Sequence, residues 1–213
     1  MPRILLSVVL CGILSLTSVR AQTIAVFQCP IELELTNDQG DMAAVDYLRN
    51  YGTKGKTRAL EFLHKIMPGF IKNQFSKAGY ILLPLDTLAG IKSNNYGCPA
   101  LSLRKAVGSR VADQYARISF KDIGMLEQGV NQTDPFSRQK KIVKLRCRIQ
   151  LYDSSRKLVK QAEAIFQSGD PVAHPEIIGV NLHDYIGDRW MQELKIYEIC
   201  CKMSLIRALD TLR

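Results

Sequence analysis

Cysteines, histidines and alternating cations are the side chains of this sequence that could do chemistry. Cys98 lies between Gly97 and Pro99 at the expected start of a helix, and it is the only cysteine in a position that could lower its thiol pKa. The thiolate is the nucleophilic form of cysteine. A Cys/His nucleophile built on Cys98 is therefore one interpretation, and a disulfide or a structural thiol is the favoured one.

The three histidines do not have the spacing of a metal site. His64 is expected within a helix, His174 precedes Pro175 in a loop, and His183 stands next to Asp184. No two of them have the spacing of zinc ligands, and no cysteine stands at zinc-finger spacing from them. We expect ordinary surface histidines, with a cluster of His174, His183 and Asp184 as the alternative. The sequence predicts no catalytic residue, no metal ligand and no cofactor.

Gly55-Lys56-Thr57 resembles the end of a phosphate-binding P-loop. That motif requires a glycine five residues before Gly55, and Asn50 stands there. We therefore expect a flexible basic loop, with Thr57 near the start of a helix. The sequence also has no Gly-x-Ser-x-Gly nucleophile elbow, which weighs against an α/β-hydrolase.

Cations alternate with apolar residues along two predicted strands, Asp113 to Lys121 and Ile142 to Tyr152. If these strands are neighbours, five cations share one face of the sheet: Arg117, Lys121, Lys144, Arg146 and Arg148. We expect Tyr115 and Tyr152 among these cations, and the nearby carboxylates that could neutralise them are Glu32, Glu34 and Glu163. A solvated face is the favoured interpretation, because antiparallel sheets commonly leave one face in water. A binding site for an acidic glycan or a lipid head group is the alternative.

The strand from Ile142 to Tyr152 is predicted to form a hairpin with Lys157 to Gln167. Asp153 to Arg156 has turn composition, so we expect Tyr152 to pair with Lys157. This register sets apolar residues opposite each other on one face. On the other face it sets Arg146 opposite Glu163, which is a favourable cross-strand pair.

The remaining elements follow from hydrophobic periodicity. We predict strands at Thr23–Leu35 and Tyr80–Leu85, and helices at Thr57–Ala78, Pro99–Val111 and Leu182–Leu212. Pro30 indicates an edge position or a bulge in the first strand. Pro68-Gly69 is expected to kink or split the first helix, and Gly79 to end it. The order predicts an α/β (α+β) fold, in which a long C-terminal helix covers a mixed sheet of about five strands with a C-terminal hairpin.

The first 22 residues have the pattern of a secretory signal. Arg3 precedes the apolar stretch Ile4–Leu16, and small residues precede a cleavage site after Ala21. We expect a signal peptide at 1–21 and a single domain at 22–213, located in the periplasm or outside the cell. Leu10 before Cys11 does not fit a lipoprotein signal, and no second apolar run has the length of a membrane helix.

The whole chain carries a formal net charge of +9. Removal of the predicted signal peptide leaves 27 basic and 20 acidic residues, a net charge of +7. This charge could attract acidic polymers or anionic lipid head groups. It is below the charge density of a dedicated nucleic-acid binder, so we expect no nucleic-acid partner.

Five cysteines follow the predicted cleavage site: Cys29, Cys98, Cys147, Cys200 and Cys201. An odd number in an exported protein leaves at least one thiol unpaired within the chain. Cys200 and Cys201 are adjacent on a predicted helix, where they point about 100° apart and should not bond each other. The pairing of the five is otherwise left open by the sequence.

The chain loosely resembles the α/β domain shared by the curli secretion channel protein, the TolB amino-terminal domain and related envelope lipoproteins. The resemblance rests on element order, on the helix end at Ala78-Gly79, on the strand entry Ala112-Asp113-Gln114-Tyr115 and on the hairpin turn at Tyr152-Asp153. Ser18-Val19-Arg20-Ala21-Gln22 looks like the signal-peptide ends of Bacteroidota. The resemblance implies envelope assembly and protein contacts, generally without catalysis, and it carries no functional residue over to this chain.

The leading hypothesis is therefore a non-enzymatic exported protein that binds another cell-envelope component. A hydrolase or thiol-dependent enzyme that uses Cys98 or a His/Asp cluster is one alternative. A binder of acidic glycans or lipid head groups through the basic sheet face is the other.

Overall fold

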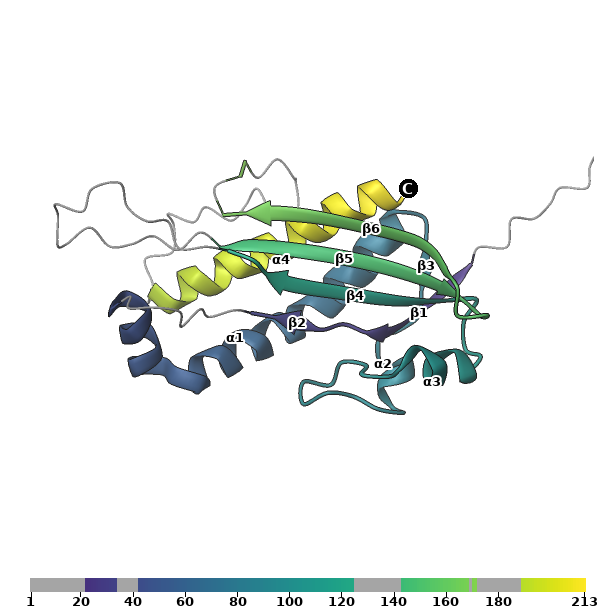
Figure 1. The fold of residues 1–213 in the computed structure, drawn as a ribbon, viewed down its shortest axis with the longest axis horizontal. Coiled ribbons are helices and arrows are strands. Elements are labelled where there is room, and N and C mark those ends of the chain that lie inside the picture. The colour runs from purple at the N-terminus through teal and green to yellow at the C-terminus, as the bar shows by residue number, and fades with distance from the viewer. Residues whose placement is uncertain (1–21, 34–41, 125–142, 169, 172–188) are drawn as a thin grey trace, which may run out of the picture.

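A mixed β-sheet with helices packed on both faces is the framework of the molecule (Figure 1). The structure, a computed structural model, describes residues 22–33, 42–124, 143–168, 170–171 and 189–213, and for 42–59 and 189–194 it describes the backbone only. The strands are β1 (Thr23–Gln28), β2 (Ile31–Glu32), β3 (Ile81–Leu82), β4 (Gln114–Asp122), β5 (Lys144–Asp153) and β6 (Leu158–Gln167). The helices are α1 (Met42–Lys77), α2 (Asp86–Ala89), α3 (Leu103–Gly108) and α4 (Arg189–Leu212).

The strand order confirms the predicted fold class. The sheet runs β3-β1-β4-β5-β6, and β2 also pairs with β4. β1 is parallel to β3 and β4, and β2 is parallel to β4, whereas β5 is antiparallel to both β4 and β6. The result is a mixed sheet that ends in the predicted hairpin. The predicted signal peptide at 1–21 lies outside the described residues.

The first predicted strand is divided into two. β1 and β2 are separated at Cys29-Pro30, and the pairing of β1 with β4 shifts register between Val26 and Gln28. Pro30 has no N–H to donate, but its carbonyl accepts a hydrogen bond from the N–H of Phe120 at 2.9 Å. The prediction of one continuous strand was wrong, and the irregularity expected at Pro30 is present.

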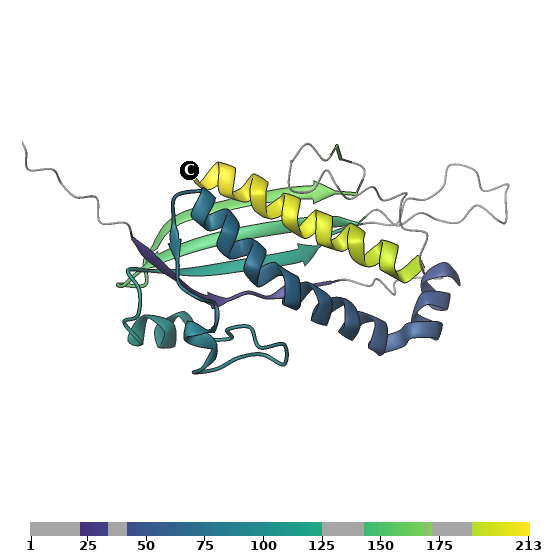
Figure 2. The ribbon, with the colours of Figure 1, turned by 180° about the vertical axis from the view of Figure 1, so that it is seen from behind.

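Helices α1 and α4 lie side by side over one face of the sheet, here called the inner face (Figure 2). α1 contributes four fully buried side chains at helical spacing: Leu63, Met67, Ile71 and Phe75. In α4, side chains at helical spacing are also buried: Tyr197, Cys201, Leu205, Leu209 and Leu212. The predicted start of this helix, Leu182, lies outside the described residues. In the described part of the chain, no helix is long and apolar enough to cross a membrane.

Helix α1 is longer than the sequence predicts. It contains Gly55-Lys56-Thr57, so these residues are helical, and the expectation of a flexible loop was wrong. Pro68 lies inside α1 without dividing it. Gly79 ends the helix as predicted, with a positive φ of 85°. Its N–H donates to the carbonyl of Ser76 at 2.9 Å, which is part of a Schellman-type ending.

A second, smaller core packs α2 and α3 against the opposite face of β1. It consists of Ala25, Phe27, Leu88, Leu101, Ala106 and Tyr115. The helix predicted at Pro99–Val111 is shorter, because Ser102 is the N-cap of α3 and its hydroxyl accepts from the N–H of Lys105. Pro99 forms an isolated bridge with Ser93 instead. Because both faces of β1 are covered, Ile24 to Phe27 are all buried.

The β5–β6 hairpin forms, but its register differs by two residues from the prediction. Arg148, not Arg146, pairs with Glu163, and Cys147 pairs with Ala164 rather than with Ala162. One residue of the offset comes from the turn, where Asp153 rather than Tyr152 is bonded to Lys157. The other comes from an irregularity between Leu151 and Tyr152. Because the shift is even beyond the irregularity, the side chains of β6 from Lys160 to Gln167 keep their predicted faces.

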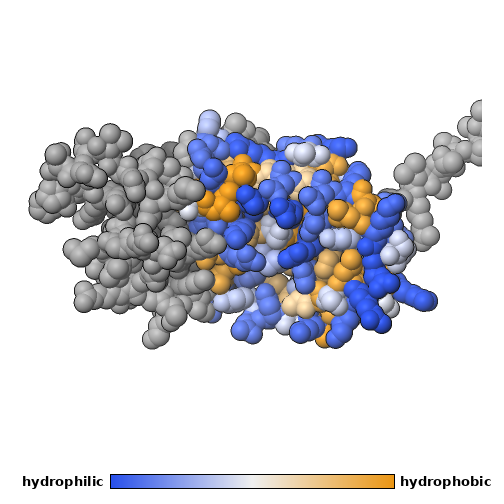
Figure 3. Space-filling model, in the orientation of Figure 1, coloured by the Kyte–Doolittle hydropathy of each residue, from blue (hydrophilic) through white to orange (hydrophobic). Residues whose placement is uncertain are grey.

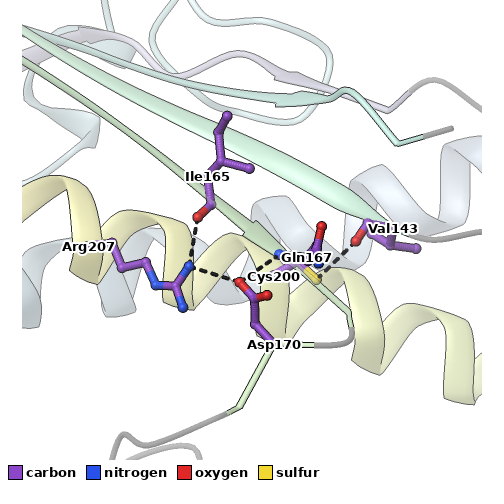
Figure 4. Close-up of polar contacts among 6 residues, drawn as sticks. All are labelled: Val143, Ile165, Gln167, Asp170, Cys200 and Arg207. Carbon is purple, nitrogen blue, oxygen red and sulfur yellow. Dashed lines mark hydrogen bonds and ion pairs between the residues drawn. The ribbon is translucent and has the colours of Figure 1, made fainter.

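Arg207 anchors α4 to the end of β6 (Figure 4). Its Nη1 donates to the carbonyl of Ile165 at 2.9 Å and to Asp170 Oδ2 at 2.9 Å. Its guanidinium carbon also lies 4.7 Å from the centre of the Phe166 ring. Cys200 Sγ faces the carbonyl of Val143 at 3.9 Å. These contacts position α4 over the inner face of the hairpin.

Candidate functional site

The sequence-predicted cations lie together on the face opposite α1 and α4, here called the outer face. β4 and β5 are antiparallel neighbours, with Arg117 opposite Gln150, Lys121 opposite Arg146 and Ser119 opposite Arg148. We define the basic outer face by its five cations: Arg117, Lys121, Lys144, Arg146 and Arg148. Figure 1 shows no described helix in front of β5 and β6 on this side. Figure 3, in the same view, shows hydrophilic side chains interspersed with smaller hydrophobic patches over the described part of the molecule.

Glu163 on β6 holds two of these cations side by side. Its Oε2 lies 2.7 Å from Arg148 Nε and 2.6 Å from Arg148 Nη2. Its Oε1 lies 3.1 Å from Arg146 Nε, within ion-pair distance but without a hydrogen bond. These side chains are about one-third exposed or more, so the pairs contribute little to stability. Their main effect is to fix the positions of two guanidinium groups.

The basic outer face keeps an excess of positive charge. Its five cations face two described carboxylates, Glu163 and the exposed Glu32 opposite Lys121, which leaves a formal charge of +3. Glu34 lies outside the described residues. Arg117 Nε is buried, and the described residues offer it no hydrogen-bond partner. Among the described carboxylates, Glu163 and Glu32 therefore neutralise only part of the charge that these cations carry.

The two tyrosines expected among the cations lie elsewhere. Tyr115 is buried in the second core beneath α3. Tyr152 is packed against Phe27, with their rings 5.9 Å apart in an edge-to-face arrangement. The expectation that they line the basic surface was wrong, because α2 and α3 cover that end of the outer face.

Among the described residues, Cys98 and His64 are the one pair in which a potential nucleophile contacts a potential base. Cys98 Sγ lies 2.9 Å from His64 Nδ1, and both side chains are buried. Tyr96 stacks on the imidazole at 4.7 Å between ring centres. Asn94 shapes the loop, because its Oδ1 accepts from the N–H groups of Tyr96 and Cys98 at 3.0 and 2.9 Å. The sequence reveals Cys98 but not its partner, which is 34 residues away.

The environment of this pair favours uncharged groups. Burial raises the pKa of the Cys98 thiol and lowers the pKa of His64. The helix start that could have lowered the Cys98 pKa is absent, because α3 begins at Leu103 and Cys98 is not at its N-terminus. His64 is also buried, which corrects the expectation of a surface histidine. His174, His183 and Asp184 lie outside the described residues.

All five cysteines after the predicted cleavage site are buried and free of disulfide bonds. Desolvation raises the pKa of Cys29, Cys147, Cys200 and Cys201, and that of Cys200 reaches about 12. These thiols remain protonated at neutral pH. Within the described ranges, no group of three His, Cys, Asp or Glu side chains is arranged to hold a metal ion.

Comparison with protein-family models gave no match, and comparison with curated proteins gave no significant match.

Proposed function

We propose that this chain is an exported, non-enzymatic binding protein whose basic outer face contacts an anionic component of the cell envelope. The observation that carries the proposal is the convergence of five cations from β4 and β5 on a face with no described helix in front of β5 and β6. Residues 1–21 act as the signal peptide for export in this proposal. The resemblance to envelope α/β domains supports the same class of function.

The arrangement of the arginines supports ligand binding over simple solvation. Glu163 holds Arg146 and Arg148 close together, which places two guanidinium groups next to each other before any ligand arrives. Guanidinium groups bind carboxylate and phosphate oxygens through paired hydrogen bonds. Prior ordering of the two side chains reduces the entropy lost on binding. The component bound is a carboxylate-rich or phosphate-rich surface in the envelope.

A pull-down from envelope extract tests this proposal. Arg146→Ala/Arg148→Ala removes both positioned cations, and Lys65→Ala/Lys72→Ala removes the same charge from exposed positions of α1. We expect the unaltered protein and the α1 variant to recover one partner that dissociates as salt is raised. The outer-face variant should lose it. No specific partner, or equal recovery by both variants, would overturn the proposal.

Thiol-dependent catalysis is a second candidate, favoured by the 2.9 Å contact between Cys98 and His64. It requires transfer of the thiol proton to His64, and burial opposes the charged pair that results. Alkylation of the native protein by iodoacetamide measures this directly. Rapid modification of Cys98 at neutral pH, abolished in His64→Gln, would support the enzyme. Modification only after unfolding would exclude it.

A further inference from the structure

An open pocket of about 470 Å³ lies at the covered end of the outer face, between α3 and the β5–β6 turn. Three arginines from two segments line it: Arg104 on α3, Arg110 just after α3, and Arg156 in the β5–β6 turn. Ser154 and the almost fully buried Tyr115 also line it. Among the described residues, no carboxylate lines the pocket.

Two of these arginines have an unusual backbone. Arg110 has φ of 53° and Arg156 has φ of 69°, and they are the only non-glycine residues with positive φ in the part of the chain that the structure describes. Side chains with a Cβ are disfavoured in this left-handed region. Backbone conformations of this kind are retained preferentially at functional sites, where another gain offsets the strain.

The geometry of the two turns explains the positive φ at these positions, but it does not explain why arginine occupies them. Arg110 ends α3, with its N–H donating to the carbonyl of Val107 at 3.2 Å. Arg156 closes the hairpin turn, with its N–H donating to the carbonyl of Asp153 at 2.9 Å. Glycine or asparagine is the usual residue at both kinds of position. Arginine adds strain at both turns, and both arginines line the same pocket.

We infer that this pocket binds a phosphate group. None of the three arginines has an ion pair with a carboxylate among the described residues. The nearby Asp153 is engaged, because its Oδ1 accepts from Ser155 and from the N–H of Lys157. A phosphate monoester has up to two negative charges and at least three acceptor oxygens, so it can bind more than one guanidinium at once. A carboxylate has one charge and two oxygens, so it matches a pocket with three arginines less well.

This inference does not depend on the proposed function. Arg146 and Arg148 do not line the pocket, and the pocket arginines lie outside the five cations of the basic outer face. The phosphate group has two sources in principle, a free phosphorylated solute and a phospholipid head group. The experiment separates them.

In the first arm, the full chain is titrated with inorganic phosphate in a buffer that is initially phosphate-free and of low ionic strength. Calorimetry measures the binding. The variants are Arg110→Gly and Arg156→Gly, which remove the guanidinium and relieve the strain in one step. We expect each to weaken binding by about tenfold or more, while the melting temperature stays equal or rises. Lys105→Gln, which removes an exposed cation from α3 outside the pocket, should leave binding unchanged.

Co-sedimentation with phosphatidic acid vesicles is the second arm, with phosphatidylcholine vesicles as the reference. Loss of vesicle binding in both glycine variants assigns the site to a head group, whereas loss of phosphate binding alone assigns it to a solute. Either result supports the inference. It is overturned if inorganic phosphate and vesicles both fail to bind saturably. It is also overturned if the glycine variants bind as well as the unaltered protein. Vesicle binding lost only in Arg146→Ala/Arg148→Ala would support the proposed function and refute the pocket.

Discussion

The rings of Phe75 and Tyr80 lie 5.9 Å apart across the turn that ends α1. The N–H of Tyr80 donates to the carbonyl of Phe75 at 2.9 Å, so one residue pair combines a hydrogen bond with an apolar contact. This pairing is typical of a Schellman ending and requires a left-handed residue between them, which is Gly79. The turn directs the chain from the last turn of α1 into β3.

Replacement of Gly79 tests this ending. Gly79→Ala should lower the free energy of unfolding by about 1 kcal/mol, because alanine is strained at positive φ. Gly69→Ala inside α1 is the matched control, since its added Cβ meets no atom within 4 Å and its φ is not positive. That control should raise the stability by about 0.5–1 kcal/mol. Urea denaturation of both variants measures the two changes, and a shift of the same sign in both would contradict the explanation.

Protonation of His64 should destabilise the protein in mild acid. Its pKa is lowered in the folded state, so the unfolded state binds more protons below pH 6.5 and stability falls as pH decreases through this range. We expect a lower melting temperature at about pH 5.5 than at about pH 7.5, with a smaller difference in His64→Gln. Glu198 and Asp153 have lowered pKa values and titrate below this window. Equal pH dependence in both proteins would show that His64 does not contribute.

The buried thiols should destabilise the protein in alkali. Their pKa values are raised in the folded state, so only the unfolded state loses these protons just above pH 9, and stability falls as pH rises. Each thiol can change the unfolding free energy by up to about 1.4 kcal/mol per pH unit. Urea unfolding of Cys200→Ala isolates one thiol from the lysines that also titrate there. As pH rises, the stability of the Cys200→Ala variant should decline less steeply than that of the unaltered protein.

Arg207 should contribute to stability through several contacts at once. Arg207→Ala removes the hydrogen bond to the Ile165 carbonyl, the ion pair to Asp170 and the packing on Phe166. We expect a loss of about 1–2 kcal/mol. Asp170→Asn should lose less than about 1 kcal/mol, because the contacts with β6 remain. Thermal unfolding measures both, with Asp210→Asn at an exposed position of α4 as the control.

The faces of β4 and β5 could be predicted from the sequence, and the register of the hairpin could not. Alternation depends only on neighbours along one strand, so the burial of Ile118 and Ile149 follows directly from the pattern. Register depends on turn geometry. The left-handed residue of this turn is Arg156 rather than glycine, so the sequence does not mark the position where the turn closes. Val159, which has no partner on β5, carries no signal for a bulge either.

The candidate sites also differ in how far the sequence reveals them. The basic outer face is visible in the sequence because its cations occupy alternate positions of β5 and same-face positions of β4. The contact between Cys98 and His64 depends on how the loop from Asn94 to Cys98 folds against α1, which no periodicity encodes. Arg104 and Arg110 flank the end of α3, and they meet Arg156 of the β5–β6 turn only in the folded chain. Convergence of this kind has no local signature.

Five reduced thiols inside the protein have a consequence for its biogenesis. A chain exported as proposed would meet oxidants before it folds, while Cys147 and its neighbours are still accessible. Correct folding and disulfide formation would then compete in time, and each mispaired cysteine would remove a side chain that the core requires. The yield of native protein would depend on how fast the sheet closes beneath α1 and α4. Under those conditions, rapid burial would be what keeps the five thiols reduced.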